Sequence, residues 1–225
     1  MVRAQLRQDQ SVKNAADLQE LFFAGARTVI DAIADDSVDA AWDRPSVLEE
    51  QLVSSVAGHL ARSGIWVVAD YLKAGVATGQ PDFDSAGAYF AAVAAGATPE
   101  VKLAIRGRGA AVAALGREAI LHRSQEDLGW LGLELKRLPD EHLMTVFEGK
   151  VMRLSDYLAT RIVEQAVHLD DLARSVGRQP WSLPAEHQAV TISVATDVAR
   201  RVHGPDATIR ALYRGGFAEQ VFPVL

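Results

Sequence analysis

Cysteine and long hydrophobic runs are both missing from this sequence of 225 residues. Without cysteine there is no disulfide, no thiolate metal ligand and no cysteine nucleophile, so any bound metal must be held by His, Asp or Glu. Any thiol that takes part in chemistry must come from outside the chain. The longest apolar stretches are too short and too often broken by glycine to span a bilayer, and the polar start MVRAQLRQDQ lacks a signal-peptide core. These absences predict a cytoplasmic protein.

Positive charge is also in short supply. Lysine and arginine number 23 against 29 aspartate and glutamate residues, which gives a net charge of −6. Since no basic cluster is present, we expect neither nucleic acid nor a membrane surface as a partner. The 49% hydrophobic and 23% charged residues are the ordinary globular mixture. The length suits one large domain or a domain with an appendage, and the richness in Ala, Arg, Val and Asp is typical of a GC-rich genome.

Helical periodicity, in contrast, is present along most of the sequence. Apolar residues recur every three to four positions, and turn signals separate the repeats. The clearest helix start is Thr98-Pro99-Glu100, a capping residue followed by proline and an acid. Glycines such as Gly116 weaken the long helix that begins there. The pattern predicts helices over 15–33, 47–71, 86–95, 98–138, 155–176 (capped by Ser155) and 184–202, and a last short helix capped by Asp206.

The main helices and their connections predict the fold class. Four long helices joined by short to medium loops favour an all-α antiparallel four-helix bundle over residues 14–177. Residues 1–13 are expected to be a ragged N-terminus, and residues 178–225 a short, mainly helical C-terminal extension packed on the bundle. Segment 144–152 is partly alternating and fits either a strand or an extended link.

One helical stretch carries a candidate site. In ATRIVEQAVHLDDLA (159–173), Glu164 and His168 are four positions apart and therefore share one helix face. Such a pair is either a solvated ion pair or two ligands of a metal site. Glu118 and His122 have the same spacing among polar neighbours and are predicted to lie on the surface, so spacing alone does not decide between the two.

The flanks of this face favour a cavity. Tyr157, Arg161 and Asp171 lie on the same stripe as the pair, bordered by apolar residues on one side and mostly apolar or small residues on the other. The wall of a polar cavity inside a bundle would sit in that position.

A catalytic metal site needs three protein ligands and one open position. Of the other five histidines, only His59 sits in the middle of a predicted core helix, and the neighbouring Gly58 leaves space for close approach. His59 is therefore either a hydrogen-bonded interior histidine or the third ligand. One carboxylate and two neutral imidazoles would hold a divalent ion with a net charge of +1, which suits an incoming thiolate or hydroxide.

Three segments carry a family resemblance: WDRPS (42–46), VAGHL (56–60) and RLSDYLATRIVEQAVHLDDL (153–172). They resemble the N-terminal domain of mycothiol-dependent maleylpyruvate isomerases, part of the DinB-like superfamily of metal-binding four-helix bundles. The resemblance covers about residues 15–177. It implies that His59, Glu164 and His168 bind Zn²⁺, with Ni²⁺ or another divalent metal as alternatives, and that mycothiol, an actinobacterial thiol, is the cofactor.

The resemblance also implies an activity. The metal-bound thiolate would attack an electrophilic small molecule in an isomerase or S-transferase reaction. The residues expected to assist are Arg161, which would orient Glu164 or bind a substrate carboxylate, Asp171, which would orient His168, and Tyr157, which would donate a hydrogen bond into the cavity. For each of the three the alternative is a purely structural role.

The sequence departs from the family pattern in two places. It has LEEQLVSSVAGHL where a tryptophan-containing segment usually precedes the first histidine, and residues after Gly177 do not match the family's separate C-terminal domain. The substrate therefore stays open. So do two alternatives, a hydrolase that uses a metal-bound hydroxide and a non-catalytic metal- or ligand-binding protein. The sequence does not distinguish a monomer from a homodimer.

Overall fold

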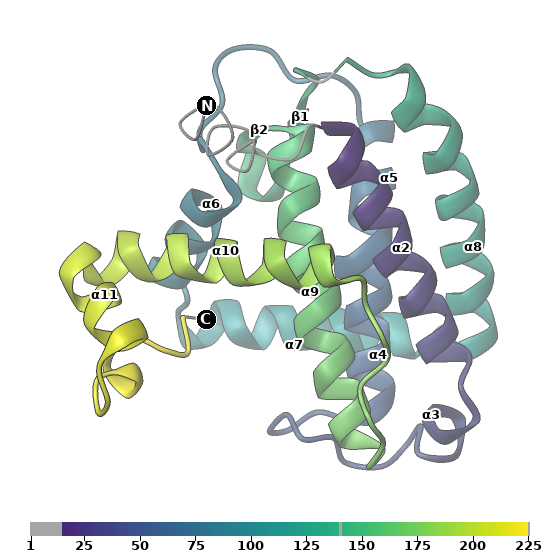
Figure 1. The fold of residues 1–225 in the computed structure, drawn as a ribbon. Helices are drawn as coiled ribbons and strands as arrows, with labels where there is room; N and C mark the ends of the chain where they lie inside the picture. Colours follow the sequence, from purple (N-terminus) through teal and green to yellow (C-terminus); the bar gives the residue numbers. More distant parts are fainter. Residues whose placement is uncertain (1–14, 140, 225) are drawn as a thin grey trace.

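The computed structural model describes residues 15–139 and 141–224 and confirms the all-α class. The predicted N-terminal segment 1–13 and the first predicted bundle residue lie outside the described residues. Four helical rods run side by side in Figure 1 and form the bundle. They are α2 (Ala15–Ala34), the continuous rod α4–η1–α5 (Val53–Ala61, Arg62–Trp66 and Val67–Lys73), α8 (Arg117–Glu134) and α9 (Leu154–Ser175).

Shorter elements connect and cover these rods. The strands β1 (Leu143–Thr145) and β2 (Val151–Arg153) form an antiparallel hairpin in which Met144 pairs with Met152. Segment 144–152 therefore contains strands, one of the two structures that the sequence allowed. The remaining elements are α3 (Asp36–Ala40), α6 (Ala86–Ala95), α7 (Pro99–Ala113), η2 (Leu135–Arg137), η3 (Phe147–Gly149), α10 (Ala185–His203), α11 (Pro205–Tyr213) and η4 (Ala218–Gln220).

The predicted single helix 98–138 is wrong, because it is two helices that run in different directions (Figure 1). Gly116 separates them with a φ of +87°, a conformation that favours glycine. Only α8 joins the bundle, whereas α7 crosses α4. The crossing is tight: a Cβ on Gly109 would lie 2.8 Å from the Ser55 carbonyl oxygen, and one on Gly58 2.6 Å from the Gly109 carbonyl oxygen. Because these glycines have no side chains, α7 lies directly against His59. The sequence predicted such a close approach beside Gly58.

Three predicted helix starts are also wrong. The second helix begins at Val53 and not at Val47, because the preceding residues form a turn closed by a Pro45–Leu52 bridge. Helix α9 begins directly after β2, so Arg153 and not Ser155 is its capping residue. Helix α11 is preceded by Gly204, and Asp206 lies within its first turn.

A π-helical turn interrupts the second rod and ties it to α9. In this turn, η1, backbone carbonyls are released from the α-helical pattern and accept side-chain hydrogen bonds. The Ser63 carbonyl accepts from Arg161 Nη1 at 3.0 Å, and the Gly64 carbonyl accepts from Gln165 Nε2 at 2.9 Å. The rod that carries His59 is thereby held at a fixed distance from the helix that carries Glu164.

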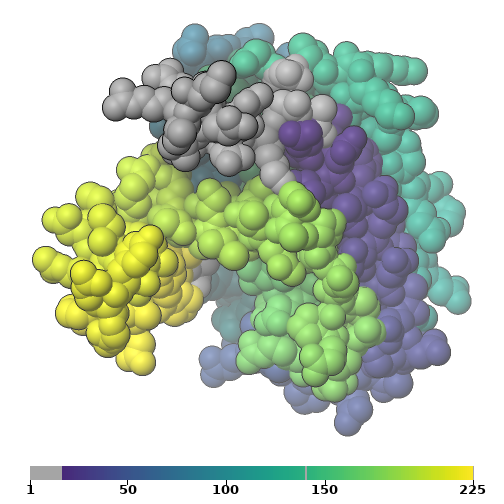
Figure 2. Space-filling view, viewed as in Figure 1, coloured from purple at the N-terminus to yellow at the C-terminus, as the bar shows by residue number. Residues whose placement is uncertain are grey.

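The C-terminal helices lie across the bundle. Helix α10 crosses α9 and also packs on α6, and Figures 1 and 2 show α11 projecting to one side. At the crossing with α9, His187 is fully buried and its Nε2 lies 3.0 Å from Gln165 Oε1. A side chain on Gly25 would collide with both groups, so this glycine makes room for the pair.

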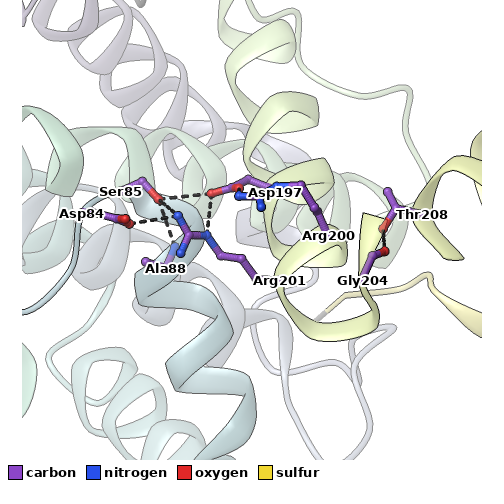
Figure 3. Close-up of polar contacts among 8 residues, drawn as sticks. All are labelled: Asp84, Ser85, Ala88, Asp197, Arg200, Arg201, Gly204 and Thr208. Atoms are coloured by element: carbon purple, nitrogen blue, oxygen red, sulfur yellow. Dashed lines mark hydrogen bonds and ion pairs between the residues drawn. The ribbon is translucent and has the colours of Figure 1, made fainter. Parts of the chain in front are cut away.

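A polar latch joins α10 to the start of α6 (Figure 3). Asp197 Oδ2 accepts hydrogen bonds from Ser85 Oγ at 3.1 Å and Arg201 Nε at 2.9 Å, and Arg201 Nη2 reaches Asp84 Oδ1 at 2.9 Å. Ser85 is also the N-cap of α6. A Cβ on Gly87 would lie 2.1 Å from Asp197 Oδ2, so the glycine allows this close approach. The latch fixes α6, which forms one wall of the site described below.

We expect Asp197→Asn to lower the free energy of unfolding by about 1–2 kcal/mol at pH 7, because charge-assisted hydrogen bonds are lost. Although burial opposes the shift, hydrogen bonds from Arg200 and Arg201 lower the pKa of Asp197. Such a carboxylate contributes its stability above the unfolded-state pKa of about 3.9 and loses it as pH falls through the folded-state pKa. Urea denaturation should therefore show a difference between wild type and variant that shrinks below about pH 4.

The matched control is Glu186→Gln, since Glu186 is exposed on the same helix. It should unfold at nearly the wild-type urea concentration. Identical denaturation curves for wild type and Asp197→Asn at pH 7 would show that the latch contributes nothing to stability.

Candidate metal centre

Two helices bring the three predicted ligands together. His59 comes from α4, while Glu164 and His168 come from successive turns of α9. Glu164 Oε2 lies 3.4 Å from His59 Nε2 and 3.4 Å from His168 Nε2, and one ligand atom from each residue falls within 4.8 Å of the others. No second such group of His, Asp and Glu side chains occurs among the described residues. The arrangement therefore provides a compact set of three potential ligands.

The burial of this triad distinguishes it from Glu118 and His122, which are both exposed as predicted. The side chains of His59, Glu164 and His168 are 18–20% exposed. They are shielded from bulk water but remain accessible to a ligand. His122, by contrast, pairs with Glu126 at 3.2 Å while both side chains are about 70% exposed. The same residue types thus form a surface pair on α8 and a half-buried site on α9, because Glu164 and His168 face His59 of α4 whereas His122 points to solvent.

Hydrogen bonds set the charges of the triad. Although burial opposes the shift, His168 and His59 hold the pKa of Glu164 well below its usual range. Burial likewise opposes the charge on His168, but hydrogen bonds with Asp171 and Glu164 raise its pKa to about 9. Burial lowers the pKa of His59. Without metal, the triad therefore holds an anionic carboxylate, a neutral imidazole and a protonated one, and metal uptake must release the proton of His168.

The donor set fits a divalent metal. Two imidazoles and one carboxylate are a common ligand set of catalytic zinc sites, and three protein ligands leave a coordination position open. His168 Nδ1 lies 2.9 Å from Asp171 Oδ2, which directs Nε2 toward Glu164. Metal-binding histidines usually have such an outer partner. The three side chains are therefore arranged as the ligands of a divalent ion would be.

Arg161 and Tyr157 form a buried layer beside the triad. Arg161 is 4% exposed, and its Nη2 lies 3.9 Å from Glu164 Oε1. Its Nε donates to Thr160 Oγ1 at 2.9 Å, and its guanidinium carbon lies 4.6 Å from the centroid of the Tyr157 ring. Burial raises the pKa of Tyr157 well above its usual value, so the phenol keeps its proton. Of the three residues predicted to assist, Asp171 and Arg161 contact the triad directly, whereas Tyr157 contacts Arg161.

Two cavities meet at the triad. The first, with a volume of about 240 Å³, is here called the aromatic cavity because it is lined by Tyr71, Phe83, Tyr89, Phe90 and Tyr157. The second, of about 460 Å³, is called the aliphatic cavity and is lined by Leu48, Val56, Val163 and Val167, with His168 and Asp171. Both are bordered by His59, Phe90, Val93, Ile105 and Glu164. The potential metal site is therefore reached from two sides.

The sequence did not predict that several of these residues line the site. Tyr89 and Phe90 come from α6, and Ile105 comes from α7, which was predicted to be part of a bundle helix. The sequence contains one indication of their burial. In AGAYFAAVAA these two aromatic residues stand among small ones, which is unusual for a solvated helix. Which face of α6 meets the triad depends on the crossing helices, and no local pattern records it.

Comparison with known proteins supports a family relationship. A family model described as "Mycothiol maleylpyruvate isomerase N-terminal domain" matches residues 23–173. The matched range contains all three potential ligands and ends before α10. No curated protein and no solved structure matches the chain. Among the described residues, no helix is long and apolar enough to cross a membrane.

We expect Zn²⁺ to raise the melting temperature of the protein, since an ion that binds only the folded state stabilises it by about 2.7 kcal/mol at one hundred times its dissociation constant. His59→Ala and His168→Ala should each abolish this stabilisation and the stoichiometric metal found by elemental analysis. His122→Ala, which removes an exposed histidine, should retain both. Equal melting temperatures of the wild type with Zn²⁺ and with a chelator would contradict a metal site.

The hydrogen bond between Asp171 and His168 leads to a second prediction. Asp171→Asn should weaken metal binding by about 10–100-fold, because it removes the carboxylate that orients and polarises the imidazole. Competition with a chromophoric chelator measures the change. The control is Asp170→Asn, since the adjacent Asp170 is half exposed and lies 3.9 Å from Arg174 on the outer face of α9. A similar loss of affinity in both variants would mean that Asp171 has no special role.

Proposed function

Since this chain belongs to the mycothiol maleylpyruvate isomerase N-terminal domain family, we propose that it is a metal- and mycothiol-dependent enzyme. His59, Glu164 and His168 would hold the metal, with zinc as the first candidate. A divalent ion in this position would lower the pKa of a bound thiol, so that the thiolate would be available for attack at neutral pH. The chain has no cysteine of its own, which agrees with a thiol supplied by a cofactor.

The observation that carries this proposal is the position of the triad between two cavities. A reaction between a thiol and an electrophile needs both molecules near one point, and proximity of this kind contributes a large part of the rate enhancement. His59 and Glu164 border both the aromatic and the aliphatic cavity. The aliphatic cavity, nearly twice as large, is our choice for the entry of the thiol, and the aromatic cavity is our choice for the electrophile.

The residues around the triad have distinct tasks in this proposal. Asp171 holds the His168 ring through Nδ1, so that Nε2 stays directed toward Glu164. Arg161 is fixed by the Ser63 carbonyl and Thr160, which leaves Nη2 to orient Glu164 and to donate a hydrogen bond to a substrate oxygen. Tyr157 stays protonated and packs against the guanidinium, which keeps Arg161 in place.

The reaction is of the isomerase or S-transferase type. In the first, the thiolate adds to a double bond and leaves an electron pair on the neighbouring carbon, and the adduct rotates about the resulting single bond. That electron pair then restores the double bond as the thiolate departs. In the second, a carbon–sulfur bond forms, and a leaving group departs with its electron pair. The family name refers to isomerisation, but residues 178–225 lie outside the family match. Mycothiol is an actinobacterial thiol, so we place the protein in the cytoplasm of such an organism.

The test is turnover of small electrophiles, maleylpyruvate among them, by the zinc-loaded protein. We expect product only when both Zn²⁺ and mycothiol are present, and a loss of at least about 100-fold in His168→Ala. The His122→Ala variant should keep full activity. Product formed by water without any thiol would instead identify the hydrolase alternative. A folded protein that binds neither metal nor thiol would refute the enzyme and leave a non-catalytic role.

A further inference from the structure

The aromatic cavity has a lining that indicates the shape of its ligand. Its rings form a connected cluster: Tyr89 lies 5.5 Å from Phe90, 5.6 Å from Phe83 and 6.3 Å from Tyr157 between centroids, and Tyr71 lies 5.6 Å from Tyr157. Such walls favour a flat, largely apolar ligand, which gains contact area and favourable stacking geometry.

The charged groups at this cavity indicate the charge of the ligand. Four cationic side chains line it, namely Arg62, Arg108, Lys150 and Arg161, against two acidic ones, Glu148 and Glu164. Lys150 is paired with Asp82, and Arg161 lies beside Glu164. Arg62 and Arg108 form no ion pair with an acid in the part of the chain that the structure describes. The excess of positive charge, in a chain of net charge −6, favours an anionic ligand.

One further contact places Arg108 near the cavity wall. Its guanidinium carbon lies 5.8 Å from the centroid of Phe147, which also lines the cavity. A cation on an aromatic face keeps its hydrogen-bond donors free for a carboxylate. The cavity therefore combines apolar walls with two arginines that are available to an anion.

The size of the aromatic cavity limits its content to one small molecule. Its volume of about 240 Å³ is below the range of roughly 300–1,000 Å³ typical of sites for drug-sized ligands. The adjoining aliphatic cavity offers about 460 Å³ more for a second molecule. One flat molecule of about the size of a substituted benzene ring matches the aromatic cavity.

We propose that the electrophile of this protein has a flat, largely apolar body, such as an aryl or conjugated group, and carries a single carboxylate. The body packs among Tyr71, Tyr89 and Phe90, and the carboxylate is bound by Arg62 and Arg108. A short dicarboxylate is a weaker ligand, because it has no apolar face to bury against the rings. That the ligand reacts as an electrophile rests on the proposed function. Its binding in the aromatic cavity needs neither metal nor thiol.

The experiment measures binding of three probe compounds to the full chain, with and without Zn²⁺, by isothermal titration calorimetry. Cinnamate has both the ring and the charge, cinnamamide has the ring alone, and maleate has charge without a ring. We expect cinnamate to bind about tenfold or more tightly than either of the others, with or without the metal. Maleate or cinnamamide binding as tightly as cinnamate, or no binding of cinnamate, would overturn the proposal.

Variants locate the binding. Arg62→Gln and Tyr89→Leu should each weaken cinnamate binding by about tenfold. Ala92 is exposed on α6 and lines the aromatic cavity but not the aliphatic one. Ala92→Phe should therefore weaken cinnamate binding, because the larger side chain fills part of the cavity without disturbing the core. Val167→Ala, in the aliphatic cavity alone, should leave cinnamate binding unchanged. Unchanged binding in the first three variants would place the ligand elsewhere.

The outcomes of this experiment and of the turnover experiment are separable. Calorimetry without Zn²⁺ requires no catalysis, so a protein that binds cinnamate but shows no metal- and thiol-dependent turnover would keep the cavity assignment and lose the proposed function. A protein that turns over maleylpyruvate with mycothiol but binds maleate and cinnamate equally would keep the function and lose the assignment.

Discussion

The rest of this structure depends on one interaction: the carboxylate of Glu164 lies between the imidazoles of His59 and His168 and pairs with both. An ionised carboxylate that is 18% exposed is costly unless it is matched by positive charge and hydrogen bonds. His59 and His168 supply the bonds in the absence of metal, and Arg161 adds the charge from behind. A divalent ion would take over the role of the proton on His168. The same side chains thus form a stable polar cluster in the metal-free protein and a ligand set for a metal.

Holding this cluster requires α4 and α9 to stay in register. The π-helical turn after His59 does this with its own backbone, since its free carbonyls accept from Arg161 and Gln165 on α9. Two successive turns of α9 therefore have a polar partner on the second rod. The Gly58–Gly109 crossing lets α7 pack closely against the second rod. The three potential ligands are consequently held in place by side chains of α9 that bind backbone carbonyls of the second rod and by the close helix crossing at Gly58 and Gly109.

The C-terminal extension is coupled to the site although the family match does not include it. Gln165 connects the π-helical turn to His187 of α10, and the Asp197 latch connects α10 to α6. Helix α6 in turn carries Tyr89 and Phe90, which line the aromatic cavity. Residues beyond the family match therefore hold in place a helix that lines the aromatic cavity, whereas the cavity lining and the three potential ligands lie within the matched range.

Local sequence determined the helices and the identity of the potential ligands. Periodicity located α2, α6, α9 and α10, and the absence of cysteine restricted a metal site to His, Asp and Glu. Local patterns failed where chain direction depends on a single residue: Gly116 turns α7 out of the bundle, and only packing shows that it does so. The meeting of His59 with Glu164, and the joining of two cavities there, involve residues about a hundred positions apart. Such contacts are decided by tertiary packing, because a periodic pattern states which face of a helix is buried but not which helix it meets.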